Sequence, residues 1–188
     1  MTRDIVLGQA VIGTDTTTRK VGLALGGALL IALAAQVSVP MFPVPMTLQT
    51  LAVLLVGLTL GARLGAATVA TYLGYGAMGL PVFSGGMSAA ALMGPTAGFL
   101  FGFVAMAWLA GLAAERGIAR GFAGTLMAAL LVSAALYLPG LAWLATFTGM
   151  EKAVALGALP FLVGDVVKAA IAALVVSGGW AALKGLRR

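Results

Sequence analysis

The sequence predicts an all-α integral membrane protein, a bundle of six transmembrane helices with both termini in the cytoplasm. Of its 188 residues, 62% are hydrophobic and 9% are charged, and the mean hydropathy is +1.12. Soluble domains carry charge on about a quarter of their residues. At about 20 residues per spanning helix the length allows about six spans. We therefore expect residues 1–188 to form a single membrane domain.

Six apolar segments follow a polar, Thr-rich stretch at 1–20, which we expect to lie in the cytoplasm. The segments cover about 21–40, 46–62, 64–78, 89–114, 121–144 and 157–183. The second and third are short for spanning helices, so we expect them to be tilted or buried by their neighbours. The first 20 residues lack the long apolar core of a signal peptide, and the first apolar segment is expected to act as an uncleaved anchor.

Turns between these segments carry the residues expected to break helices. Pro40, Pro43 and Pro45 separate the first two segments, and Pro45 suits a helix start because its missing N–H costs nothing there. A longer Gly-rich loop runs from Gly79 to Ser88. We expect this loop to be ordered but not helical.

The lysines and arginines determine the predicted orientation, because basic residues concentrate on the cytoplasmic side of a membrane protein. With the N-terminus inside, the cytoplasmic set comprises Arg3, Arg19, Lys20, Arg63, Arg116, Arg120, Lys184, Arg187 and Arg188. Only Lys152 falls outside, and Lys168 lies within the membrane. This bias supports six spans with both ends inside, and it places the Gly79–Ser88 loop outside.

Asp165 and Lys168 interrupt the last apolar segment and are the strongest candidates for a binding site. A charge deep in a spanning helix costs about 2.5–3.5 kcal/mol on insertion scales. Residues three apart lie on one helix face, so the two groups point the same way. Together they offer an acceptor and a donor to a small polar ligand. A structural ion pair is the alternative interpretation. A proton relay is a third, but no second buried acid is available to continue it.

The Gly-rich loop is the second candidate. Its adjacent glycines, Gly85 and Gly86, let backbone N–H groups approach a ligand closely. Ser84 adds a hydroxyl, and Phe83 can cover an apolar ring. An ordinary interhelical turn explains the same residues equally well.

Polar residues of the first spans come next. Gln49 begins a short helix beside a proline turn, so we include it among the candidate ligand contacts. For Gln36 we expect a hydrogen bond within the bundle, since an amide in lipid requires a partner. The tyrosines and one tryptophan suit either a pocket wall or the aromatic belt at the interface, and we favour the belt. They are Tyr72, Tyr75, Tyr137 and Trp143.

Small residues recur at spacing four in the first helix, at Ala24, Ala28 and Ala32, with Gly22 and Gly26 offset by two. Such a stripe lets another helix pack closely. The partner is either a helix of this bundle or a separate subunit.

Several activities are excluded by what the sequence lacks. It contains no His and no Cys, so thiol catalysis and the usual zinc sites are absent. It contains no Gly-x-x-x-x-Gly-Lys-Ser/Thr phosphate loop, so it does not hydrolyse ATP by that route. No nucleophile and base can be assembled, and we predict neither an enzyme nor a cofactor.

Four stretches together resemble the BioY family, the biotin-binding S components of energy-coupling factor (ECF) transporters. The stretches are Pro43–Thr50, Gly79–Gly86, Gly94–Phe99 and Gly164–Lys168, and the resemblance covers about 21–183. The resemblance implies an outward-facing vitamin pocket in a multi-pass protein of the bacterial inner membrane. It also implies two kinds of partner, a transmembrane coupling subunit and cytoplasmic ATPases. The alanine stripe is similar to the motif by which such components meet the coupling subunit.

Biotin, the ligand that the resemblance implies, suits the charged pair. Its ureido ring has two N–H donors and one carbonyl acceptor, which Asp165 and Lys168 can match. Charge-assisted bonds in a dry pocket are worth about 1.5–3 kcal/mol each. Alternatives are an S component for another vitamin and a stand-alone proton-coupled carrier. Two departures concern the loop, because Met87–Ala90 lacks an expected further glycine and Ala97 replaces a glycine.

Overall fold

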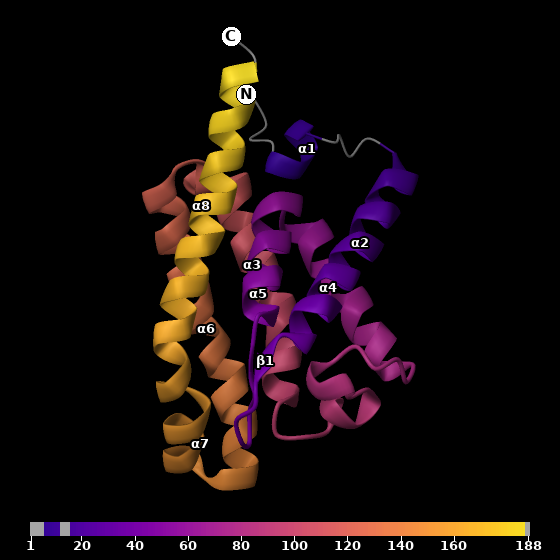
Figure 1. Cartoon of the computed structure of the whole chain (residues 1–188), viewed down its shortest axis with the longest axis vertical. Coiled ribbons are helices and arrows are strands. Elements are labelled where there is room, and N and C mark those ends of the chain that lie inside the picture. The colour runs from indigo at the N-terminus through magenta and orange to yellow at the C-terminus, as the bar shows by residue number, and fades with distance from the viewer. Residues whose placement is uncertain (1–5, 12–15, 187–188) are drawn as a thin grey trace.

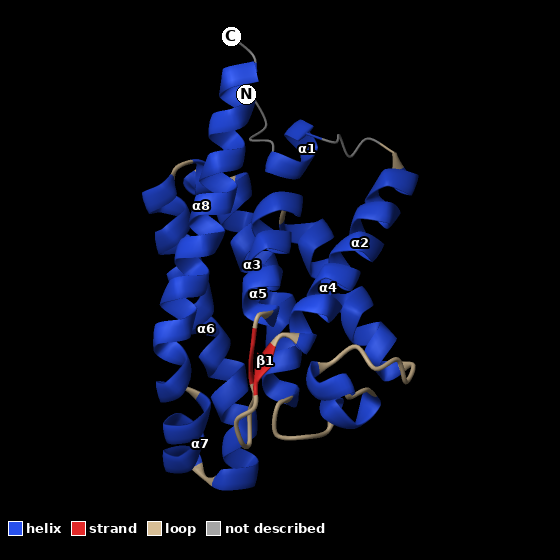
Figure 2. Cartoon of the chain, viewed as in Figure 1, coloured by secondary structure: helices blue, strands red, loops and turns tan. Residues whose placement is uncertain are grey.

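The computed structural model describes residues 6–11 and 16–186, and this part of the chain is almost entirely helical (Figure 2). The α-helices are α1 Leu7–Val11, α2 Thr17–Gln36, α3 Gln49–Leu60, α4 Ala62–Ala77, α5 Ala97–Glu115, α6 Phe122–Thr148, α7 Met150–Gly157 and α8 Leu162–Leu186. Short 3-10 helices are η1 Ser84–Gly86, η2 Ala89–Leu92, η3 Ile118–Arg120 and η4 Leu159–Phe161. Each of the six apolar segments contains one long helix.

Four helical stretches of the described chain are long and apolar enough to cross a membrane: Thr17–Gln36, Ala97–Glu115, Phe122–Thr148 and Met150–Gly185. Helix α3 is apolar but has 12 residues, a length of about 18 Å, which is well short of a bilayer core. Many large apolar side chains point outward, among them Leu33, Leu131 and Val163. An outer surface of this kind suits contact with lipid.

The proline turn is not helical, as predicted, but it also contains a short β-ribbon that the sequence did not suggest. Strands β1 (Ser38–Val39) and β2 (Met46–Thr47) form a small antiparallel ribbon there, with Ser38 opposite Thr47. Prolines that cannot continue a helix leave these flanking residues extended, and extended residues satisfy their backbone groups by pairing. The ribbon brings Thr47 to the start of α3.

The helices of the fourth and sixth segments begin later than predicted. Residues 79–96 form turns and the two short helices η1 and η2, so α5 starts at Ala97 rather than near 89. Helix α7 lies in the interval between the fifth and sixth predicted segments, and the sixth segment contains η4, with Pro160, followed by α8. Asp165 therefore lies in the first turn of α8, three residues after Leu162 and about 4.5 Å from it along the helix axis.

Helices α2 and α1 also differ from expectation. Helix α2 starts at Thr17, inside the stretch predicted to be a polar tail, and the Thr16 side chain accepts a hydrogen bond from the Arg19 N–H. Helix α1 was not predicted. Of the cations used to orient the chain, Arg3, Arg187 and Arg188 lie outside the described residues.

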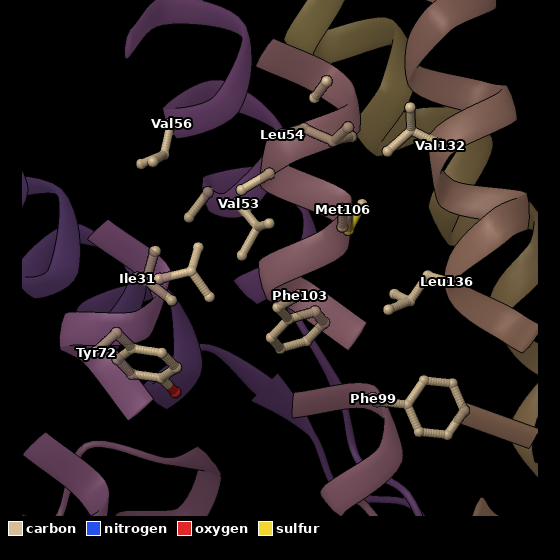
Figure 3. Close-up of a cluster of buried hydrophobic side chains, with 14 of the residues drawn as sticks. Ile31, Val53, Leu54, Val56, Tyr72, Phe99, Phe103, Met106, Val132 and Leu136 are labelled. Carbon is tan, nitrogen blue, oxygen red and sulfur yellow. The ribbon is translucent and has the colours of Figure 1, made fainter. Parts of the chain in front are cut away.

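Glycines allow α3, α4 and α5 to pack closely at the centre of the molecule. A Cβ added at Gly57 of α3 would lie 2.5 Å from the Ala107 carbonyl oxygen of α5. One added at Gly111 of α5 would lie 2.2 Å from the Ala62 nitrogen of α4. The apolar core continues from these contacts towards α2 and α6 (Figure 3). Its members include Ile31, Val53, Tyr72, Phe103, Met106 and Val132.

The connections between the helices separate into two ends (Figure 1). The start of α2 and the last turns of α8 lie at the upper end of the view, and the proline turn, residues 79–96 and α7 lie towards the lower end. The binding pocket described below is built at the lower end.

The alanine stripe of α2 faces largely inward, which favours a helix of this bundle as its partner, one of the two possibilities that the sequence left open. Ala28 is fully buried and Ala32 is 9% exposed, while Ala24 is half-buried. The helix packs against α3 and α4 on this side. Its outer side presents Leu25, Leu29 and Leu33.

Candidate ligand-binding pocket

A pocket of about 650 Å³, including the space at its open mouth, lies among α3, α5, α6, α8 and the loop that contains η1. Its lining is mostly apolar with a few placed polar groups, which is typical of small-molecule sites. It is lined by Val44, Pro45, Thr47, Gln49, Thr50, Phe83, Ser84, Met87, Ala91, Thr96, Phe99, Leu100, Phe103, Leu136, Tyr137, Gly157, Phe161, Asp165 and Lys168.

A polar cluster from three helices forms one wall of this pocket. Lys168 Nζ donates to Thr50 Oγ1 at 3.0 Å and lies 3.5 Å from Asp165 Oδ1. The Tyr137 hydroxyl donates to Asp165 Oδ2 at 2.5 Å. The side chains of Lys168 and Asp165 are 8% and 14% exposed. The cluster thus joins α3, α6 and α8 around two opposite charges that are almost out of solvent.

This arrangement leaves bonding capacity for a ligand. An ammonium has three N–H donors, and Lys168 uses one well on Thr50 and another weakly on Asp165. The carboxylate accepts one short bond, from Tyr137, and one long contact, from Lys168. An ion pair built only for stability would be expected to have closer contact between its charges. The cluster instead holds Lys168 and Asp165 beside each other, with an N–H of Lys168 and acceptor sites on Asp165 still available to a ligand.

Gln49 precedes Thr50 at the start of α3 and is held by two neighbours. Its Nε2 donates to the Tyr72 hydroxyl at 2.6 Å, and its Oε1 accepts from Thr47 Oγ1 at 2.9 Å. Gln49 is 5% exposed and lines the pocket. Gln49 thus lines the pocket, and its contact with a ligand stays a prediction.

Phe83 and Ser84 of the loop also reach the pocket. Phe83 is 1% exposed, packs edge-on against Tyr72 with ring centroids 5.3 Å apart, and fits against Gly76, where a Cβ would collide with its ring. Its carbonyl oxygen accepts from Gln36 Nε2 at 3.1 Å. The bond expected for Gln36 within the bundle is thus present, and it anchors the loop.

Gly85 and Gly86, by contrast, do not line the pocket. Both are exposed, with φ of 68° and 72°, and a Cβ at either would meet nothing within 4 Å. They are glycines because the turn requires left-handed backbone, which residues with a Cβ adopt at a cost. Their predicted role as backbone contacts to a ligand is not supported.

Sequence reasoning missed several pocket residues and misassigned two tyrosines. Tyr137 and Tyr72 were assigned to an interfacial belt, yet Tyr137 holds Asp165, and Tyr72, fully buried, holds Gln49. Tyr137 precedes Asp165 by 28 residues, so no local spacing linked them. The apolar wall was not predicted at all. It consists of Phe99, Leu100, Phe103, Leu136 and Phe161.

No group of three His, Cys, Asp or Glu side chains that could hold a metal ion occurs in the described part of the chain. The apolar outer surface and the pocket together define a helical membrane protein with a binding site for a small, partly polar ligand. The chain belongs to the BioY family, whose model matches residues 8–185.

Named relatives agree with this assignment. A probable biotin transporter BioY of Pyrococcus horikoshii is 44% identical over 147 residues, 78% of this chain and 86% of the relative. The biotin transporter BioY of Thermotoga maritima is 40% identical over 148 residues, with the same coverage. That of Rhizobium etli is 39% identical over 163 residues, covering 81% and 87%.

A solved structure shares the fold. The crystal structure of an S-component for biotin from an ECF-type ABC transporter superposes with a TM-score of 0.76, covering 88% of this chain and 94% of the other. The sequences are 24% identical. This similarity establishes the architecture, and the assignment of individual pocket residues rests on the geometry described above.

Proposed function

We propose that this chain is the biotin-binding S component of an ECF-type vitamin uptake transporter, capturing biotin outside the cell for import. The observation that carries the proposal is the cluster of Asp165, Lys168, Tyr137 and Thr50 inside an otherwise apolar pocket. The relatives named as biotin transporters supply the identity of the ligand. The protein binds and hands over its substrate without chemical conversion, so it needs no cofactor and is not an enzyme.

Biotin suits both halves of the pocket. A ureido N–H can donate to the Asp165 carboxylate, and the ureido carbonyl can accept the spare N–H of Lys168. The aromatic side chains of Phe99, Phe103 and Phe161 cover the apolar thioether ring and alkyl chain. The amide of Gln49 adds a further polar contact. Such charge-assisted bonds in a largely dry site are worth about 1.5–3 kcal/mol each.

We propose that the chain crosses the bacterial inner membrane six times with both termini in the cytoplasm. The described basic side chains outside the pocket support this, since all but Lys152 flank the ends of helices at the upper end of Figure 1: Arg19, Lys20, Arg63, Arg116, Arg120 and Lys184. In that orientation the pocket opens outward. The short helices α3 and α4 are shielded from lipid by their neighbours.

Import requires energy from partners, because the sequence holds no phosphate loop. We propose docking to a transmembrane coupling subunit that is driven by cytoplasmic ATPases, with α2 as the docking helix. Because Ala28 and Ala32 are buried, we move the contact to the outer side of α2. Gly22 and Gly26 lie there four residues apart with open space beside them, and small residues at this spacing admit a close helix.

The test is calorimetric titration of the purified full-length chain with biotin, using thiamine and riboflavin as controls. We expect saturable biotin binding and none of the other two. Tight binding of thiamine or riboflavin in place of biotin would assign the chain to another vitamin. Uptake in cells that lack ECF partners, abolished by dissipating the proton gradient, would support a stand-alone proton-coupled carrier instead.

A further inference from the structure

The pocket has one cationic side chain, and two parts of biotin could bind it. Biotin presents both a neutral ureido ring and a negatively charged tail, and each could engage an ammonium. Among the residues that line the pocket, all of them in the described part of the chain, Lys168 is the single cation and Asp165 the single anion. The pocket wall is therefore electrically neutral before a ligand enters.

Lys168 is poorly placed to receive the carboxylate tail. Its Nζ already bonds Thr50 and lies 3.5 Å from Asp165 Oδ1. A second carboxylate on this ammonium would lie beside the first, and like charges at such a distance disfavour each other's ionised form. A neutral carbonyl avoids this repulsion and still accepts the spare N–H.

Besides the hydroxyl of Ser84, the loop offers an anion few donors. Four of its backbone N–H groups already donate within the loop: Val82 to Leu80, Phe83 to Met87, Gly86 to Phe83 and Met87 to Ser84. Lys152 of α7 is exposed and does not line the pocket. A carboxylate buried without a partner is costly, by several kcal/mol. The tail is thus better left in the water of the open mouth.

We infer that this pocket recognises the ring of its ligand and makes no contact with the charge of the tail. Its ligands then form a wider class than biotin, namely molecules with the same ureido ring on an uncharged tail. The inference rests on the proposed function and specifies which half of the substrate carries recognition.

The probe is biotin primary amide, which replaces the carboxylate by a neutral group of the same size. In calorimetry with the full-length chain we expect its Kd to lie within about fivefold of that of biotin. A solvent-exposed charge changes affinity by no more than about this factor. An amide more than about tenfold weaker than biotin would overturn the inference, since a loss of that size indicates a desolvated charge contact. A chain that binds neither molecule would instead contradict the proposed function.

Two substitutions locate the tail independently. Lys168→Gln is expected to weaken biotin and its amide by the same factor, because both present the ureido carbonyl. If Lys168→Gln weakens biotin alone, the ammonium recognises the carboxylate and the inference is wrong. Lys152→Gln is expected to leave both affinities unchanged. A selective loss of biotin affinity in that variant would place the tail on α7 and overturn the inference equally.

Discussion

The two sides of the pocket are built in different ways. On the α8 side, Asp165 and Lys168 stand on one face of a single helix, and their relation is fixed by helical geometry. On the loop side, Phe83 and Ser84 are placed by side chains of distant helices that bond the backbone of the loop, such as Gln36 and Tyr72. The first side is rigid by its own local structure. The second depends on contacts made 10 to 47 residues away.

This contrast predicts where substitutions matter most. In the proposed binding mode the charged groups on the α8 side contact the ligand, so their loss removes binding energy directly. On the loop side most substitutions change how well the loop is held, and their effects on affinity are indirect. The predictions below run from the largest expected effect on biotin affinity to the smallest.

Asp165→Asn keeps the size of the side chain and removes its charge. It weakens the bonds from Tyr137 and from the ureido ring and leaves Lys168 without a nearby carboxylate. We expect calorimetry to show biotin affinity reduced by about a hundredfold or more. Glu151→Gln is the matched control, because Glu151 is an exposed acid of α7 outside the pocket lining. Equal affinity in wild type and Asp165→Asn would show that the charge has no part in recognition.

Tyr137→Phe and Thr50→Val each remove one hydroxyl that positions the charged pair. Without these hydroxyls the carboxylate and the ammonium lose one bond each and are held less firmly. We expect each variant to reduce biotin affinity by about tenfold. Adding Tyr137→Phe to Asp165→Asn should reduce biotin affinity little further, because the charge that Tyr137 positions is already gone. Full additivity would mean that Tyr137 contacts the ligand by itself.

Gln36→Leu tests how the loop is anchored. The substitution removes the bond to the Phe83 carbonyl while retaining a side chain of similar size. We expect faster proteolysis between 79 and 96 and a biotin affinity lowered by only about threefold to tenfold, the value of one ordinary hydrogen bond. Gln9 lies on α1, outside the loop and the pocket lining, so Gln9→Leu serves as the control. Unchanged proteolysis in Gln36→Leu would indicate that the loop does not need this anchor.

Gly86→Ala separates backbone strain from ligand contact. Its φ of 72° disfavours a residue with a Cβ, but the added methyl meets nothing within 4 Å. We expect a destabilisation of about 1 kcal/mol in thermal unfolding and little change in biotin affinity. Loss of binding with unchanged unfolding would restore the contact role that the sequence suggested for this glycine.

Gly26→Leu is expected to leave biotin binding unchanged and to prevent co-purification with the coupling subunit. The new side chain enters open space on the outer face of α2, where it would block a close helix. Ala28→Leu is the contrasting variant, because Ala28 is fully buried inside the bundle and a larger side chain overpacks it. If Gly26→Leu assembles at wild-type yield, the docking face lies elsewhere.

The same contrast explains what the sequence could predict. Apolar segments located the helices, because each long helix needs an apolar stretch to lie in lipid. Two charges three residues apart located the α8 side of the site, because charges are costly within an apolar membrane helix. The roles of Tyr137, Thr50 and the aromatic wall were not predicted, since they depend on tertiary contacts. The sequence pattern also could not show that Ala28 faces inward or that Gly85 and Gly86 face solvent, because composition does not reveal which side of an element is covered.

The most direct measurement is an experimental structure of this chain with biotin bound. We expect the ureido ring to lie between Asp165 and Lys168. One ring nitrogen should lie about 2.7–3.2 Å from a carboxylate oxygen of Asp165, and the ring oxygen at the same distance from Lys168 Nζ. The tail should then point to the mouth. Biotin bound elsewhere, with the contact between Asp165 and Lys168 unchanged, would contradict the central claim and leave the pair a structural feature of the bundle.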